Sequence, residues 1–196
     1  MSKVVHPYAH RLVILRDWKS RWFADTKKYC DFLKGDVLLR QYLEKKLRGM
    51  YASMIEIERN QKMTRFIIKT SRPGLIIGRN GEGATKLKED IAKQMEKLKL
   101  TKTEDFKLEI VEVTNPEADA AIVAYMVAEG LEKRMPYRRV MKQIIEKVMT
   151  TRGVEGARIV LGGRLGGAEI ARTEELKRGS IPLQTFRADI DFKRER

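Results

Sequence analysis

The spacing of hydrophobic and polar positions divides the first part of this chain into helical and extended segments. Apolar side chains recur three and four residues apart where a helix buries one face, and at every second residue where a strand does. Asp36 precedes the first helical pattern and is predicted to cap it. A short polar stretch between the first two extended segments predicts a β-hairpin. The expected order is helix, strand, strand, helix and strand, at residues 36–47, 53–58, 64–70, 82–98 and 106–113.

A second pattern begins after Pro116. An alanine-rich helix is expected at 117–134, and Pro136 is expected to start another, because proline is favoured in the first turn. The predicted buried side of the alanine-rich helix consists of Ile122, Tyr125, Met126 and Leu131. Glycines punctuate the remainder, where strands are expected at 157–161 and 186–192. These patterns predict an α+β fold with an N-terminal arm, of which residues 1–16 are expected to be extended rather than helical.

A glycine loop, Gly78-Arg79-Asn80-Gly81, separates the second strand from the helix that follows it. Glycine lets the main chain approach a ligand closely, and the first N–H groups of a helix suit a phosphate. Arg72 and Arg79 add positive charge. The plainer interpretation is a strand-to-helix turn that uses glycine for its geometry alone. We favour contact with RNA, and we place the adjacent Ile76 and Ile77 in the core rather than in a groove for bases.

The net charge of +14 calls for an anionic partner, with nucleic acid first and an anionic membrane surface second. The charge is uneven, because residues 101–130 are acidic while both flanking regions are basic. No apolar run is long enough to span a bilayer, and we expect no signal peptide. Cys30 is the only cysteine, which excludes an intramolecular disulfide and a multi-cysteine zinc site. It is expected to be a small buried residue.

Arg138, Arg139 and Lys142 share one face of the helix expected after Pro136, and apolar residues occupy the other face. A basic face is often only solvated. Three converging cations in so basic a protein nevertheless favour phosphate binding. A glycine-rich stretch at 162–172 contributes two further cations, Arg164 and Arg172, and is interpreted as the turn of an edge hairpin.

The remaining candidate residues do not form a catalytic pattern. His6 and His10 lie in the arm, where a surface or RNA-contacting role is expected rather than a metal site. Glu174 and its acidic neighbour are interpreted as part of a solvated helix or turn. Trp22 and Phe23 are expected to anchor the arm on an apolar surface. Trp18 fits either that role or stacking on a base. No enzyme, cofactor or small-molecule substrate is expected.

The element order, with a Gly-x-x-Gly loop after the second strand, resembles a type two KH domain. The match extends further and resembles the bacterial small-subunit ribosomal protein S-three family. The most specific segments are Arg-Leu-Gly-Gly-Ala-Glu-Ile-Ala-Arg at 164–172 and Arg-Ala-Asp-Ile-Asp at 187–191. Further matching stretches lie at residues 3–7, 70–81 and 181–191. The implied organisation is an arm at 1–35, a KH domain at 36–114 and a mixed α/β domain at 115–196.

The resemblance implies a cytoplasmic ribosomal protein of the small-subunit head, beside the channel where messenger RNA enters. Its implied partners are small-subunit ribosomal RNA, messenger RNA and neighbouring ribosomal proteins of the head and shoulder. The family's basic triad matches Arg138, Arg139 and Lys142, and it is linked to the unwinding of structured messenger. Two alternatives stay open, a free KH-type RNA-binding regulator and a nucleic-acid-cleaving enzyme.

Three features depart from the family pattern. The loop interior is Arg79-Asn80, where lysines are common. The region 94–105 is longer than usual, which predicts an extended helix and loop. Many relatives also continue beyond the point that corresponds to Arg196, into strands that complete the second domain's sheet.

Overall fold

A computed structural model describes residues 5–60, 63–98 and 105–195. The chain divides into two compact units. The central unit is Trp18–Thr114, and the terminal unit combines the described residues up to Asp17 with those from Asn115 onward. Segments from both ends of the chain therefore build one unit together.

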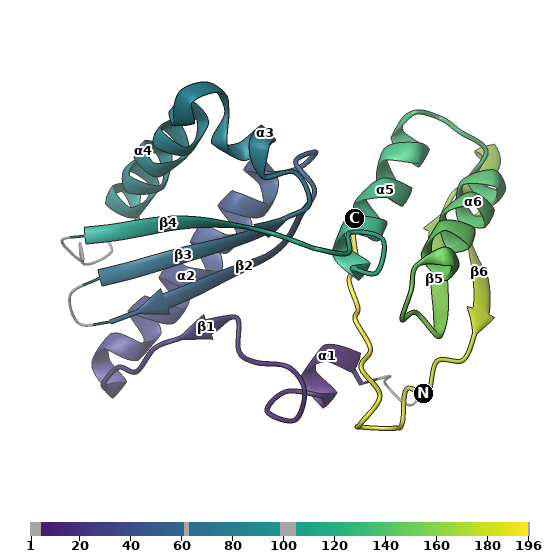
Figure 1. Cartoon of the computed structure of the whole chain (residues 1–196), viewed down its shortest axis with the longest axis horizontal. Helices are drawn as coiled ribbons and strands as arrows, with labels where there is room; N and C mark the ends of the chain where they lie inside the picture. The colour runs from purple at the N-terminus through teal and green to yellow at the C-terminus, as the bar shows by residue number, and fades with distance from the viewer. Residues whose placement is uncertain (1–4, 61–62, 99–104, 196) are drawn as a thin grey trace. The chain divides into compact units, whose positions relative to one another are not determined.

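The central unit is organised around a four-stranded sheet (Figure 1). Its strands, in their order across the sheet, are β1 Ser20–Arg21, β2 Ala52–Arg59, β3 Met63–Thr70 and β4 Asp105–Glu112. The pair β2–β3 is antiparallel, which confirms the predicted hairpin, while β4 runs parallel to β3 and β1 parallel to β2. The long connection from β3 to β4 is thus a crossover, and it carries the glycine loop.

Helices cover one face of this sheet (Figure 1). They are α2 Thr26–Lys46 and α4 Glu82–Lys97, with a short α3 Pro73–Ile77 before the glycine loop. Alternate residues of β2 and β3, such as Ile57 and Phe66, meet α2 and α4 in the core and are fully buried. The predicted apolar face of α4, which consists of Leu87, Ile91 and Met95, is also buried. Helical and strand periodicity therefore located the core of this unit correctly.

The predicted start of the first helix was wrong. α2 begins at Thr26, ten residues before Asp36, so Asp36 lies inside the helix and caps nothing. Gly35 and Asp36 together look like a helix boundary, yet both are buried in the helix interior. Asp36 is tolerated there because Arg59 and the Trp22 Nε1–H donate hydrogen bonds to its carboxylate.

The terminal unit combines helices with a two-stranded sheet (Figure 1). Its elements are α1 Pro7–His10, α5 Ala120–Glu132, α6 Tyr137–Thr150, β5 Gly156–Gly163 and β6 Arg172–Gly179. The Asp119 side chain caps α5 by accepting the N–H groups of Ala121 and Ile122. Pro136 precedes α6 as its N-cap residue. In α5 the structure buries Ala121, Ile122 and Val127, whereas Tyr125, Met126 and Leu131 are half-buried.

The strand expected at 186–192 does not exist; β6 lies earlier and contains Glu174, which had been interpreted as helix or turn. Instead of pairing with another strand, carbonyl groups of residues 183–188 accept hydrogen bonds from a side chain of the arm. The fully buried Arg11 donates to the carbonyl oxygens of Leu183, Thr185 and Ala188 at 3.1, 3.0 and 2.6 Å. The arm also contains the short helix α1, which the prediction of an extended segment at 1–16 missed.

Several side chains lie elsewhere than expected. Cys30 is exposed rather than buried. Phe23 is 91% exposed and anchors nothing, whereas Trp22 is half-buried against Asp36. Trp18 is 55% exposed. The expected longer loop within 94–105 falls largely outside the described residues. Within the described ranges, no helix has the length and apolar character needed to cross a bilayer.

Candidate nucleic-acid interface

The glycine loop joins α3 to α4 by a sharp change of backbone direction. Gly78 ends α3 with φ +71°, and its N–H bonds the carbonyl of Gly74 at 3.0 Å. Asn80 and Gly81 follow with φ values of +51° and +80°. Asparagine is one of the few non-glycine residues that adopt this conformation readily. The loop therefore forms a turn of fixed geometry, and α4 starts directly after it.

α4 begins without a side-chain cap, because its N-cap residue is Gly81. The first N–H groups of a helix have no partner within the helix, and the helix dipole makes this end attractive to an anion. Arg79 is exposed and forms no ion pair among the residues that the structure describes. Arg72 is also exposed, with its guanidinium 4.4 Å from the centre of the Tyr51 ring. This end of the central unit presents positive charge to solvent.

Sequence reasoning missed Gly83, which allows α3 and α4 to approach each other. A Cβ at this position would lie 2.5 Å from the carbonyl oxygen of Ile76. Ile76 is buried in the core as predicted, whereas Ile77 is 39% exposed, contrary to its expected core position. The sequence signal for this close approach was Gly83 itself, which follows Gly78 and Gly81 as a third glycine.

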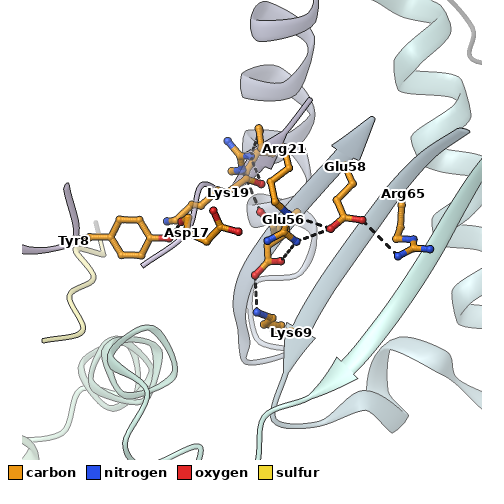
Figure 2. Close-up of polar contacts among 11 residues, drawn as sticks. Tyr8, Asp17, Lys19, Arg21, Glu56, Glu58, Arg65 and Lys69 are labelled. Atoms are coloured by element: carbon orange, nitrogen blue, oxygen red, sulfur yellow. Dashed lines mark hydrogen bonds and ion pairs between the residues drawn. The ribbon is translucent and has the colours of Figure 1, made fainter. Parts of the chain in front are cut away.

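The open face of the sheet is neutralised by its own side chains. Figure 2 shows Glu56 and Glu58 of β2 between basic residues of the neighbouring strands. Arg21 reaches Glu56 at 2.8 Å and Glu58 at 2.6 Å, and Lys69 reaches Glu56 at 2.5 Å. Each cation on this face thus meets a carboxylate, and Arg65 continues the network from Glu58. We therefore place the phosphate-attracting surface of this unit at the glycine loop, not on the sheet.

The basic face of α6 in the terminal unit has the predicted geometry. Arg138, Arg139 and Lys142 are exposed, while the opposite face buries Val140, Met141, Ile145 and Val148. Arg139 and Lys142 have no carboxylate partner anywhere in the described chain. Because the apolar face fixes the helix against its neighbours, these two cations are held at the surface and their charge is uncompensated.

Arg138 differs from the other two, because it already has an anionic partner. Its Nη2 lies 3.2 Å from the Glu174 carboxylate of β6, which also accepts the Tyr137 hydroxyl at 2.6 Å. The Tyr137 hydroxyl and the Arg138 guanidinium hold the pKa of Glu174 below its usual range. The hydrogen bond to Glu174 in turn raises the pKa of Tyr137. Neither Tyr137 nor Glu174 was a predicted site residue. The sequence signal for Tyr137 was its position beside Arg138.

The glycine-rich stretch connects β5 to β6, as expected for a hairpin. Arg164 turns back and donates to the carbonyl of Ala168 at 3.0 Å, whereas Arg172 is exposed. A shallow depression of about 480 Å³ lies between this connection and the start of α6, lined by Pro136, Tyr137, Arg138, Leu165, Gly166, Gly167, Ala168 and Arg172. The structure thus brings Arg138 and Arg172 to one hollow and leaves Arg164 outside it.

The two histidines of the arm have aromatic neighbours in the terminal unit. The His6 ring lies 4.7 Å from that of Phe192, and the His10 ring 4.2 Å from that of Phe186. No cluster of three potential metal ligands occurs in the described part of the chain.

Two family models match the chain. A KH domain model covers residues 38–118, and a model of the C-terminal domain of ribosomal protein S3 covers residues 127–195. Curated relatives carry the name small ribosomal subunit protein uS3. The relative from Clostridium novyi is 43% identical over 98% of this chain and 84% of its own length. Those from Caldicellulosiruptor bescii and Pseudomonas aeruginosa are 45% and 43% identical over 98% of this chain, and over 83% and 81% of their own lengths.

Proposed function

Because this chain belongs to the uS3 family of small ribosomal subunit proteins, we propose that it contacts both ribosomal RNA and incoming messenger RNA as part of that subunit. The family consists of structural RNA-binding proteins rather than enzymes. Small ribosomal subunit proteins of bacteria are cytoplasmic, and we assign the chain to that compartment.

The glycine loop of the KH domain is the proposed contact with an RNA backbone. A phosphate beside Gly78–Gly81 would meet the N-terminal end of α4, whose dipole attracts an anion, and the charge of Arg79. Arg72 adds charge from the residue before α3. The exposed Ile77 offers an apolar contact for a base beside this loop.

The basic face of α6 is the proposed contact with messenger RNA where it enters the ribosome. The observation that carries this assignment is the uncompensated charge of Arg139 and Lys142, beside Arg138 on a rigidly packed helix. Cations held in this way bind phosphates regardless of sequence, so they suit a messenger strand of any sequence that passes through. Holding the separated strand would assist the unwinding of structured messenger without an ATP site.

Ribosomal proteins of the head and shoulder are the proposed neighbours, and Arg164 and Arg172 are proposed to add to the RNA-binding surface. Binding to RNA should weaken as salt rises, because each phosphate contact releases counterions. Co-sedimentation with small subunits at physiological salt separates this function from that of a free KH-type regulator. A protein that stays outside those fractions would contradict the ribosomal assignment.

The decisive experiment changes Arg138, Arg139 and Lys142 together to alanine. Small subunits that carry this variant should assemble normally and translate unstructured messengers at the usual rate, but slow on messengers with a stable hairpin. Alanine at three other exposed cations of the terminal unit gives a control of equal charge change, at Lys147, Arg152 and Lys177. Equal translation of structured and unstructured messengers by the triad variant would overturn the proposal.

A further inference from the structure

The depression beside α6 combines a small apolar hollow with two cations. Pro136, Leu165 and Ala168 contribute apolar surface, and Arg138 and Arg172 provide the charge. It is shallow and open to solvent, with a volume of about 480 Å³. A flat basic surface would bind only phosphate, whereas this shape also has room for a base.

We propose that the depression binds one nucleotide of a single-stranded RNA, and that Glu174 occupies the phosphate position at Arg138 until the RNA arrives. The inference rests on the proposed function, since it assumes that RNA passes along α6. It adds a shallow depression, a residue that competes with the ligand and a second cation, Arg172, none of which the basic triad contains.

The apolar part of the depression suits a nucleobase. The Tyr137 ring lines it, and aromatic rings bind bases of any sequence by stacking. Gly166, with φ +65°, brings the hairpin connection against this ring, since a Cβ there would lie 3.6 Å from Tyr137 Cε1. The turn therefore holds its main chain beside the ring, where a side chain would take up space.

In the polar part, a carboxylate of the protein itself already occupies the anion position. The Glu174 carboxylate accepts hydrogen bonds from the Tyr137 hydroxyl and the Arg138 guanidinium, which a phosphate oxygen could accept equally. The Arg138 side chain is 74% exposed and that of Glu174 32% exposed. Exposed ion pairs of this kind contribute little energy, so an RNA phosphate can displace Glu174 at small cost.

Arg172 is placed to hold the same phosphate. It precedes Glu174 by two residues on β6, so both side chains leave the strand on one face. Arg172 lines the depression and makes no hydrogen bond or ion pair through its side chain within the described residues. Its charge acts on Glu174 without a direct contact, so the guanidinium is available to an anion that enters.

The first test measures the affinity of the full chain for a short fluorescent oligouridylate. Glu174→Gln should tighten binding by about two- to fivefold, the equivalent of one exposed ion pair. Glu175→Gln is the matched control, because this next residue points to the other face of β6 and pairs with Arg158 at 2.7 Å. If both substitutions raise the affinity equally, the change in net charge alone explains the effect, and the proposal is overturned.

A second substitution tests the opposite direction. Arg172→Gln should weaken binding and lower the slope of log affinity against log salt by about 0.7, as expected for one lost phosphate contact on a single strand. Arg178→Gln on the same strand, which pairs with Glu146 at 3.7 Å, is the control and should change the slope less. Identical slopes for the two variants would contradict a phosphate at Arg172.

Cross-linking with a 4-thiouridine oligonucleotide locates the base. Adducts on Tyr137 or on residues 165–168 are expected. Adducts confined to other parts of α6 would overturn the nucleotide pocket and leave the proposed function intact. Conversely, a triad variant that translates structured messengers normally would remove the proposed function, while the unaltered chain could still give adducts in the depression. Displacement of the oligonucleotide by equimolar uridine monophosphate would assign the pocket to free nucleotides and also overturn the proposal.

Discussion

Asp36 and Arg59 form an ion pair whose side chains are only 1% and 5% exposed. Arg59 donates through Nε at 2.9 Å and through Nη2 to the same carboxylate oxygen, while the Trp22 Nε1–H donates to the other oxygen at 2.7 Å. The Arg59 guanidinium also lies 5.2 Å from the centre of the Phe32 ring. The pair joins the middle of α2 to the end of β2 inside the central unit.

Removal of one partner should be costly, because it leaves the other charge buried. Asp36→Ala is expected to lower the free energy of unfolding by about 3–5 kcal/mol in urea denaturation. Asp31→Ala, at an exposed position of the same helix, should change it by less than about 0.5 kcal/mol. The double variant Asp36→Leu with Arg59→Met should recover much of the loss. A single variant as stable as the Asp31 control would refute this account.

Arg11 should tolerate lysine poorly, although both side chains are cationic. The guanidinium serves carbonyl groups of separate segments through Nε, Nη1 and Nη2, and lysine cannot reproduce that fork. Arg11→Lys is expected to cost about 3 kcal/mol and to speed amide hydrogen exchange around residues 181–189. The exposed Arg187→Lys is the control. Unchanged exchange in the Arg11 variant would show that the segment is held by other contacts.

Gly83 and Gly74 should respond differently to alanine. A Cβ at Gly83 would meet the main chain of α3, so Gly83→Ala is expected to destabilise the central unit by about 1–3 kcal/mol. A Cβ at Gly74 meets nothing within 4 Å, so Gly74→Ala should be neutral or stabilising by up to about 1 kcal/mol. Thermal unfolding measures both. Similar melting temperatures for the two variants would contradict the close approach of α3 and α4.

The pKa values of Tyr137 and Glu174 should be linked. The phenol donates a hydrogen bond that stabilises the charged carboxylate, which lowers the pKa of Glu174. Loss of the phenol proton would break this bond and place two negative groups together, which raises the pKa of Tyr137. Because the pKa of Glu174 is lower in the folded state, the pair stabilises the protein at neutral pH, and this contribution is lost as pH falls through that lowered pKa. In NMR titrations, Glu174→Gln should lower the pKa of Tyr137 and Tyr137→Phe should raise that of Glu174. Independent titrations would refute the link.

The sequence predicted those parts of the fold that local periodicity governs. The hairpin, α4, α6 and the exposed position of its basic face follow from residue spacing within one element. The parts that failed depend on distant partners. Asp36 looks like a cap until Arg59, 23 positions away, is seen to pair with it. The strand expected at 186–192 is absent, because Arg11 holds the carbonyls of Thr185 and Ala188, so neither is available for strand pairing.

For the candidate site too, the sequence predicted only those residues that a single helix brings together. Arg138, Arg139 and Lys142 were identified because helical geometry alone brings them together. The role of Glu174 could not be identified, because it depends on how β6 packs beside α6. Arg172 was included among the cations, but its position at a hollow with Arg138 required the tertiary structure.

Arg11 also imposes an order on synthesis. Its partners lie as many as 177 positions later in the chain, so the side chain leaves the translating ribosome long before its carbonyl acceptors exist. The central unit, Trp18–Thr114, is complete much earlier and can fold first. We therefore expect nascent chains arrested near residue 150 to show a protease-resistant central unit and a fully accessible segment before Trp18, which contains Arg11. Protection of the arm at that stage would mean that another partner shields Arg11 until the last carbonyls arrive.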